Sequence, residues 1–266
     1  MTRVYVCRTD AHPTVGLAPY LHDYINKAKS GTLYRSRLSA YSLLFFALAD
    51  FLDRSAELGA AISSLPSEKT TPSEKRISIS DYGAFPELKS GACADFLEIR
   101  LSFDERGKPY LERGGERFPV EISLSHTDAL AAVMLSDEGE VGVDIETEIE
   151  EDRAERLADR FFSSGIAVEK RGSLRSLYTL LEGAVSVFEP SKECCSQNPS
   201  DAEENHSISF TERWVLCEAI LKCEGGGFGS LTRLSALAGS TSVYSAELNF
   251  HEKRHFIAAA EFKKHK

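Results

Sequence analysis

Apolar and polar positions follow two contrasting periods along the chain, and each period predicts an element. From Arg35 to Asp53, apolar residues recur at helical spacing, which predicts a long helix. Its apolar face carries Leu38, Tyr41, Phe45, Leu48 and Leu52. A second strong helix is predicted from Thr211 to Cys223, and the glycine-rich run after it ends the helix.

Strands are predicted where the composition is β-rich or the alternation has period two. Such segments cover residues 3–7, 97–103, 120–124 and 129–135. The clearest alternation is in residues 141–146, where Gly142, Asp144 and Glu146 share one face and the aliphatic residues take the other. An amphipathic helix is predicted next, with apolar positions at Ala154, Leu157, Ala158, Phe161 and Phe162.

Two polar segments interrupt these elements. Residues 62–76 predict a loop, and residues 189–207 predict a flexible insertion. A weak internal repeat is also present, because each half runs from a strand to a long helix and then to an alanine-rich strand. Chance similarity of two alanine-rich strands is the alternative. A real repeat would make the chain a pseudo-dimer of two α+β halves, residues 1–138 and 139–266.

Composition narrows the classes of protein. The chain has 266 residues, 42% of them hydrophobic, which is enough for one large core or two small ones. We expect a cytoplasmic protein, because the N-terminus does not resemble a signal peptide and no apolar run is long enough to span a bilayer. The six cysteines form no C-x-x-C pair, so we expect reduced thiols rather than a zinc site.

The formal net charge of −10 argues against nonspecific nucleic-acid binding through a global positive field. It leaves room for a local basic pocket that binds a phosphorylated small molecule.

Candidate metal ligands lie on the alternating strand. Asp144 and Glu146 are two residues apart, so their carboxylates project from one face and could bind a hard cation such as magnesium. The alternative is the polar outer face of an ordinary strand. On the second helix Trp214, Glu218 and Lys222 form one stripe within a largely apolar surface. An acid and a base on such an apolar helix favour side chains that line a functional site, and a surface ion pair is the alternative.

Two further residues are candidates for binding phosphate or nucleotide. His126 is flanked by hydroxyl residues and could hold a phosphate, although a packed or solvated histidine is the alternative. Lys108 lies between Gly107 and Pro109, a sequence that also suits an ordinary turn. The glycine-rich residues 225–229 fit a helix stop better than a phosphate loop.

Taken in order, these segments resemble the Sfp-type 4′-phosphopantetheinyl transferases. The matching segments are Gly107–Pro109, Ser123–Thr127, Gly142–Glu146, Arg160–Ser163 and Trp214–Lys222. Each is weak alone, and the signal is their order over residues 107–229. The N-terminal third is similar only in layout, with Arg37 opening the first long helix.

The resemblance implies two similar α+β halves with coenzyme A in the cleft between them. It implies a magnesium site formed by Asp144, Glu146 and Glu218. It implies coenzyme A contacts from Arg37 and His126 at the 3′-phosphate, Lys108 and Pro109 near the adenine, and Ser125. Lys222 would meet the pyrophosphate.

The activity implied is transfer of phosphopantetheine from coenzyme A to a serine of an apo acyl- or peptidyl-carrier protein, with release of 3′,5′-ADP. The serine hydroxyl attacks the β-phosphate, and Glu218, directly or through water, accepts its proton, although other bases stay open. We expect a monomer with no nucleic-acid or membrane partner.

Two positions depart from the family pattern. Cys217 stands where the family usually has a lysine, and residues 164–166 replace a usual glutamate region. Cys217 motivates an alternative in which the same fold binds coenzyme A or a carrier protein with weakened catalysis. A third reading is an unrelated magnesium-dependent enzyme acting on another nucleotide.

Overall fold

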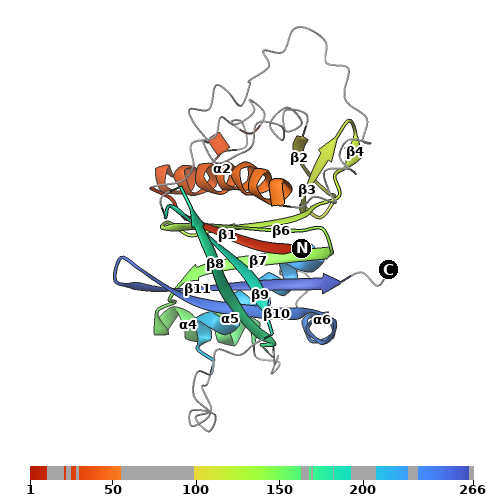
Figure 1. Cartoon of the computed structure of the whole chain (residues 1–266). Coiled ribbons are helices and arrows are strands. Elements are labelled where there is room, and N and C mark those ends of the chain that lie inside the picture. The colour runs from red at the N-terminus through yellow and green to blue at the C-terminus, as the bar shows by residue number, and fades with distance from the viewer. Residues whose placement is uncertain are drawn as a thin grey trace.

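The chain combines runs of strands with a few helices in a mixed α+β arrangement, which confirms the predicted class (Figure 1). The computed structural model describes residues 1–10, 21, 25–27, 30–54, 99–162, 168, 170–181, 183–192, 208–226 and 233–263. The first elements are β1 (Thr2–Arg8), α2 (Gly31–Arg54), β2 (Ile99–Phe103), β3 (Pro109–Arg113), β4 (Glu116–Arg117), β5 (Glu121–His126) and β6 (Leu130–Ser136). They are followed by β7 (Gly139–Thr147), α4 (Glu151–Phe161), β8 (Gly172–Leu180), β9 (Val185–Ser191), α5 (Phe210–Glu224), α6 (Leu234–Ser240), β10 (Ser242–Phe250) and β11 (Lys253–Lys263).

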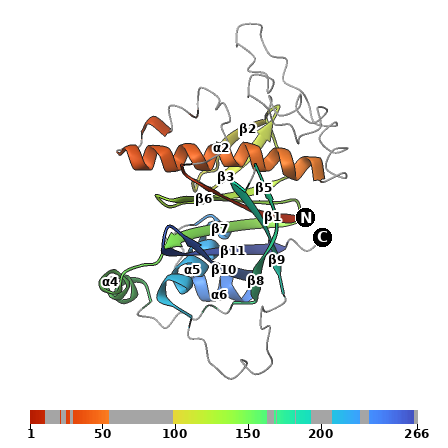
Figure 2. The same ribbon diagram turned by 60° about the vertical axis from the view of Figure 1, so that its left-hand side comes forward.

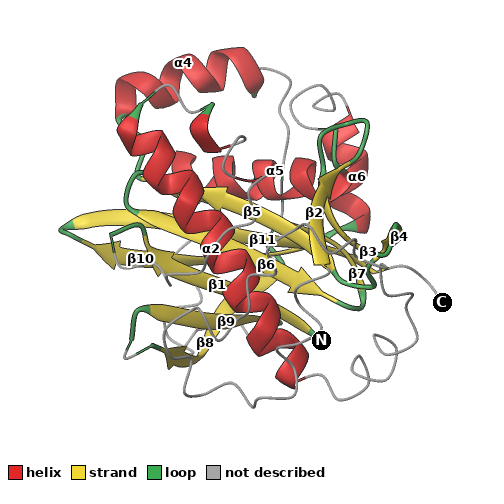
Figure 3. Ribbon diagram, turned by 90° about the horizontal axis from the view of Figure 1, so that it is seen from above, coloured by secondary structure: helices red, strands yellow, loops and turns green. Residues whose placement is uncertain are grey.

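One eight-stranded sheet carries the fold, in the order β5-β6-β1-β9-β8-β10-β11-β7. Its neighbours pair antiparallel except β8 and β10, which are parallel. The sheet curls into two layers. Helix α2 covers the layer with β1, β5 and β6, whereas α4, α5 and α6 lie beyond the layer with β7, β10 and β11 (Figures 1 and 2). A small sheet, β2-β3-β4, stands beside α2 (Figure 3).

Strand alternation divides the apolar residues among three cores. On β1, Tyr5 and Cys7 face α2, while Val4 and Val6 enter the core between the two sheet layers. On β7, the aliphatic residues of 141–145 enter the same central core. The intervening residues, Gly142, Asp144 and Glu146, therefore project toward α5. The predicted polar face of this strand is turned toward a helix rather than toward open solvent.

The long helix is confirmed, and its buried face is only partly the one predicted, since Tyr41 and Leu48 are buried as expected. Leu43, Leu44, Ala47, Leu48 and Phe51 are essentially inaccessible, whereas Leu38, Phe45 and Leu52 are only partly buried. A helix with apolar residues around much of its circumference has no single stripe that sequence can select. The buried side also accepts serines, because Ser36 and Ser39 donate their hydroxyl protons to the carbonyls of Thr32 and Arg35 one turn earlier.

Helix α5 begins and ends with local signals that the sequence carries. The Ser209 hydroxyl accepts the backbone N–H of Glu212 and caps the N-terminus. Gly225 ends the helix at a φ of 86°, a left-handed conformation that glycine adopts without strain. Between these caps, nine of fifteen residues are buried, and Glu218 and Lys222 are among the few that are not.

The space between β7 and α5 depends on Gly142. A Cβ atom at this position would lie 2.0 Å from the carbonyl oxygen of Ala219 and 2.4 Å from the backbone nitrogen of Cys223. Both atoms are backbone, so the only residue that allows this approach is one without a side chain. The glycine in the Gly142–Glu146 segment thus brings the acidic strand against α5.

Several sequence predictions can now be compared with the structure. The strands predicted at 3–7, 120–124, 129–135 and 141–146 are confirmed as β1, β5, β6 and β7. The insertion predicted from 189 begins too early, because residues 189–191 complete β9, where Glu189 pairs with Arg3. The rest of that insertion from 193 to 207, the loop at 62–76 and residues 164–166 lie outside the described residues.

The division into residues 1–138 and 139–266 stays a prediction, although one sheet is shared by strands from both ranges. Within the described residues, no helix is long and apolar enough to cross a membrane. Cys7, Cys217 and Cys223 are free and buried, and the other three cysteines lie outside the described part of the chain.

Candidate active site

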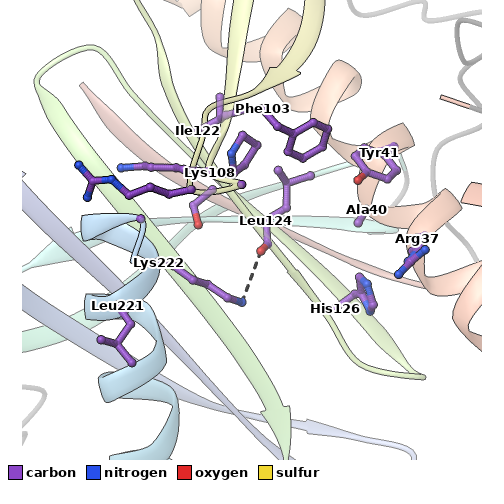
Figure 4. A pocket seen from close by; sticks show the side chains of 15 residues that line it. Arg37, Ala40, Tyr41, Phe103, Lys108, Ile122, Leu124, His126, Leu221 and Lys222 are labelled. Atoms are coloured by element: carbon purple, nitrogen blue, oxygen red, sulfur yellow. Dashed lines mark hydrogen bonds between the residues drawn. The ribbon is translucent and has the colours of Figure 1, made fainter. Parts of the chain in front are cut away.

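A cavity of about 350 Å³ opens between α2, the turn from β2 to β3, strand β5 and the C-terminal end of α5 (Figure 4). Its described lining includes four cationic side chains and a histidine: Arg37, Arg106, Lys108, Lys222 and His126. No aspartate or glutamate is among those lining residues. In a chain of net charge −10, this concentration of positive charge makes the cavity suited to an anionic ligand.

The cationic residues and His126 reach the cavity from several elements, and only Arg106 and Lys108 share one, the turn from β2 to β3. Arg37 comes from the first turns of α2, His126 ends β5, and Lys222 comes from the last turn of α5. In Figure 4, Arg37 and His126 lie together at one end of the cavity, and Lys222 extends toward Leu124. Residues as far apart in the sequence as Arg37 and Lys222 therefore line one cavity.

His126 is partly buried beside two cations. Burial, followed by the positive charges of Lys222 and Arg37, lowers the pKa of its imidazole. The ring is therefore neutral near pH 7 in the free protein. An anion placed between His126 and Arg37 would reverse the electrostatic part of this effect and favour the protonated ring.

Lys108 has a more specific position than the sequence suggests. Its side chain is buried, and its ammonium group donates a hydrogen bond to the carbonyl oxygen of Cys223 at the C-terminal end of α5. It also lies 3.5 Å from a carboxylate oxygen of Glu140. A cation at this end of a helix is favoured by the helix dipole. Lys108 thus ties the β2–β3 turn to α5, while the Lys108 stem and Pro109 line the cavity.

Three carboxylates lie next to the cavity. Asp144 and Glu146 project from β7 and Glu218 from α5. Burial and then the charge of Asp144 raise the pKa of Glu218 to about 7, against a smaller opposite effect of Lys222. Burial and the charge of Asp144 likewise raise the pKa of Glu146. Each glutamate feels Asp144, so the three predicted metal ligands lie within electrostatic range of one another.

A hydrogen-bond network connects this acidic cluster to the cationic cavity. The Lys222 ammonium donates to Oδ1 of Asp144 at 2.6 Å and to the Ser125 hydroxyl at 3.0 Å. The Ser125 hydroxyl donates to the same Oδ1 at 2.8 Å. Asp144 is 4% exposed, so this is a nearly buried ion pair with an added hydroxyl. Ser125 belongs to this network and is not among the described residues that line the cavity.

Part of the chain is similar in sequence to curated proteins of known name. The 4′-phosphopantetheinyl transferase AcpT of Salmonella typhimurium is 28% identical over 150 residues, which is 56% of this chain and 62% of that protein. AcpT of Salmonella typhi matches with the same identity and coverage. The chain is therefore similar to 4′-phosphopantetheinyl transferases over about half of its length.

This similarity covers only part of the chain. The protein spans about three fifths, 62%, of the length of the curated relatives it matches. No protein-family model matches it. Assignment to the Sfp-type branch of the phosphopantetheinyl transferases stays a prediction.

Aromatic residues from two of the matching sequence segments hold α5 in place against α4. Phe161 and Phe162 pack edge-on against Trp214, with ring centroids 5.5 Å and 6.1 Å apart. Trp214 also hydrogen-bonds to Glu218. The Phe-Phe and Trp elements thus anchor α4 to α5 and fix the helix turn that carries Glu218.

Cys217, the departure from the family pattern, lies in the apolar core beneath α5 and is 2% exposed. Burial raises the pKa of its thiol to about 12. It does not line the cavity, so the cationic wall does not depend on this position.

Several lining residues were not predicted from the sequence, among them Tyr41, Phe103 and Arg106. Tyr41 lies one helical turn after Arg37, and Arg106 lies two residues before Lys108, so both could have been inferred from those neighbours. Phe103 carried no comparable signal, because its place depends on how β2 meets the rest of the fold. Ser123, which also lines the cavity, lies in the Ser123–Thr127 segment but was not predicted as a site residue.

Proposed function

We propose that this chain transfers the 4′-phosphopantetheine group of coenzyme A to a serine of an apo carrier protein, releasing 3′,5′-ADP. The observation that carries the proposal is a cavity lined by cations and free of described acidic residues, joined through Lys222 to a cluster of three carboxylates. A polyanionic substrate and a divalent cation need these two environments side by side. The similarity to the 4′-phosphopantetheinyl transferase AcpT supports the same reaction.

In this proposal coenzyme A occupies the basic cavity. Arg37 and His126 bind the 3′-phosphate, since they lie together and both carry donors. The Lys108 stem and Pro109 form the wall nearest the adenine. Lys222 meets the pyrophosphate, and a contact there would replace its longest hydrogen bond, the 3.5 Å contact with the carbonyl of Leu124.

Magnesium is the metal that the family implies, and the donor set fits it. The described residues contain no ready-made group of three or more His, Cys, Asp or Glu side chains in metal-binding geometry. Magnesium usually keeps several waters and takes only one or two protein carboxylates besides substrate phosphates. Burial, followed by the negative charge of Asp144, raises the pKa values of Glu146 and Glu218, and a bound cation would offset that repulsion. Asp144, Glu146 and Glu218 would hold it, and when bound it would neutralise charge on the pyrophosphate.

The reaction requires a proton acceptor for the attacking hydroxyl. The carrier serine oxygen forms a bond to the β-phosphorus, and the bond from that phosphorus to the bridging oxygen breaks. The electron pair leaves with 3′,5′-ADP. Glu218 accepts the hydroxyl proton, directly or through water. Positioning and charge stabilisation supply most of the rate.

The test is a mass measurement on an apo acyl-carrier and an apo peptidyl-carrier protein incubated with the full chain, coenzyme A and magnesium. The expected result is that the carrier gains the mass of one phosphopantetheine group. No mass should be added when magnesium is chelated before the reaction. Unmodified carriers of both classes, together with no binding of coenzyme A by calorimetry, would refute the proposal.

Calorimetric binding without transfer would instead favour the weakened binding module. Coenzyme A bound no more tightly than ATP would favour an enzyme acting on another nucleotide. The burial of Cys217 away from the cavity removes the main reason to expect weakened catalysis. A monomeric state and a cytoplasmic location stay predictions.

A further inference from the structure

The two edge strands of the curled sheet meet through side chains. Strands β5 and β7 are the ends of the sheet order, and no backbone ladder joins them among the described strands. Instead, the Ser123 hydroxyl accepts the backbone N–H of Val143 at 3.0 Å, and the Ser125 hydroxyl accepts that of Ile145 at 3.3 Å. Ser123 and Ser125, two residues apart on β5, thus accept hydrogen bonds from Val143 and Ile145, two residues apart on β7. These two contacts form the seam between the edge strands.

The two serines differ in what else they bind. A serine hydroxyl offers one proton and two acceptor lone pairs. Ser125 donates its proton to Oδ1 of Asp144, and it accepts hydrogen bonds from Lys222 and from the amide of Ile145. Its capacity is therefore complete within the protein. The structure gives Ser123 the seam contact with Val143 and no link to Asp144 or Lys222 in the described part of the chain.

This accounting bears on the role of Ser125. A phosphate oxygen of coenzyme A can only accept a hydrogen bond, and the only proton on Ser125 is already donated to Asp144. Both described hydrogen bonds to the Asp144 side chain reach Oδ1, and within the described residues Oδ2 receives none. Oδ2 is then the oxygen left for another ligand.

We propose that Ser125 is a positioning residue that fixes the Asp144 carboxylate and the Lys222 ammonium relative to each other, rather than a residue that binds coenzyme A. This inference rests on the proposed function and assigns a task within it. Ser125 couples the seam between the sheet edges to the acidic cluster, since the same oxygen that accepts from Ile145 holds Asp144. Lys222 stays within reach of the cavity, with its charge matched to Asp144.

The inference predicts a separation between substrate affinity and turnover. Removing a residue that orients a metal-binding carboxylate typically lowers metal affinity or activity by about 10–100-fold. In Ser125→Ala, we therefore expect kcat and magnesium affinity to fall by about tenfold or more. The dissociation constant for coenzyme A alone should stay within about twofold, because no contact to the ligand is removed.

The experiment compares Ser125→Ala with Ser123→Ala in the full chain. Each variant loses one hydrogen bond between β5 and β7, and Ser125→Ala also loses those to Asp144 and Lys222, so both should melt at a lower temperature and Ser125→Ala at the lower of the two. Calorimetry measures the affinity for magnesium and, separately, for coenzyme A, and carrier modification gives kcat and KM. Only Ser125→Ala should lose magnesium affinity. Ser125→Thr, which keeps the hydroxyl, should recover part of the lost affinity.

Two outcomes would overturn the inference while leaving the proposed function intact. One is a Ser125→Ala variant with unchanged kcat and a tenfold weaker affinity for coenzyme A, which would make Ser125 a substrate contact. The other is an equal loss of magnesium affinity in both alanine variants, which would make the role purely structural. A wild-type chain that neither binds coenzyme A nor modifies a carrier would overturn the proposed function and this inference together.

Discussion

Replacing Gly142 with alanine tests whether the approach of β7 to α5 sets the geometry of the site. The new Cβ would lie 2.0 Å from the Ala219 carbonyl oxygen, whereas real Cβ atoms essentially never approach within 3.0 Å. Strand and helix must therefore separate by about 1 Å, because both clashing atoms are backbone and no side chain can rotate away. Glu218 and Lys222 would move with the helix, away from Asp144.

The structure gives the size of both effects. A displacement of 1 Å at a site that works by positioning can lower the rate by about 100-fold. Overpacking costs about 1–3 kcal/mol of folding free energy, and in a chain of this size each kcal/mol lowers the melting temperature by roughly 2–4 °C. Gly142→Ala should thus remain folded at 25 °C and transfer phosphopantetheine about 100-fold more slowly.

The assay needs a control that carries the same strain elsewhere. At Gly172, a Cβ would lie 2.0 Å from the carbonyl oxygen of Ser191, between strands that do not line the cavity. Gly172→Ala should lose similar stability and keep its transfer rate below the melting transition. Gly239→Ala, where a Cβ meets nothing within 4 Å, controls for the substitution itself.

Carrier modification followed by mass spectrometry at fixed coenzyme A and magnesium gives the rates, and thermal melts give the stabilities. A Gly142→Ala variant that is destabilised but transfers at the wild-type rate would refute the reasoning. Equal rate losses in the Gly142 and Gly172 variants would attribute the effect to stability alone.

Other predictions concern the charges around the site. Glu218→Gln should abolish transfer, and its melting temperature at about pH 8 should exceed that of the wild type, because the amide removes the repulsion from Asp144. The pKa of Glu218 is raised to about 7, so the folded state binds the extra proton, and this stability is lost as pH rises from about 4.5 through 7. The melting temperatures of variant and wild type should therefore diverge over that range, and parallel curves would contradict the assignment. Cys217→Lys should lower the melting temperature sharply, since it places an ammonium group in the core, while Cys217→Ala should lower it only modestly. Coenzyme A should bind with proton uptake at His126, whose pKa is lowered in the free protein, so calorimetric affinity should strengthen between about pH 8 and pH 6. His126→Gln should remove that dependence.

The sequence predicted the elements of the fold better than their pairing. Period-two alternation identified β7, and helical spacing with a terminal glycine identified α5, because both depend on neighbours in the chain. Neither pattern shows which strands become edges. That β9 lies between β1 and β8, so that one sheet joins both halves of the chain, follows from long-range pairing that local periodicity does not encode.

For the candidate site, too, the residues could be predicted but their contacts could not. Arg37, Lys108, Pro109, His126 and Lys222 were predicted together, and the structure places all five on one cavity wall. The partner of each polar atom could not be predicted. The Lys108 ammonium group donates to the C-terminal end of α5, and the Ser125 hydroxyl donates to Asp144. Both contacts form only when the curled sheet brings distant segments together.

The described lining of the cavity contains no aspartate or glutamate, although the chain as a whole is strongly anionic. This contrast affects how a charged ligand reaches the cavity. At about 0.01 M salt, electrostatic fields extend roughly 30 Å, so an approaching polyanion is repelled by the whole molecule of net charge −10. Near 0.15 M the range falls to about 8 Å, and the ligand responds mainly to the cations at the mouth. Moderate salt should therefore speed encounter, while higher salt weakens retention. The affinity for a polyanion should pass through a maximum at intermediate ionic strength.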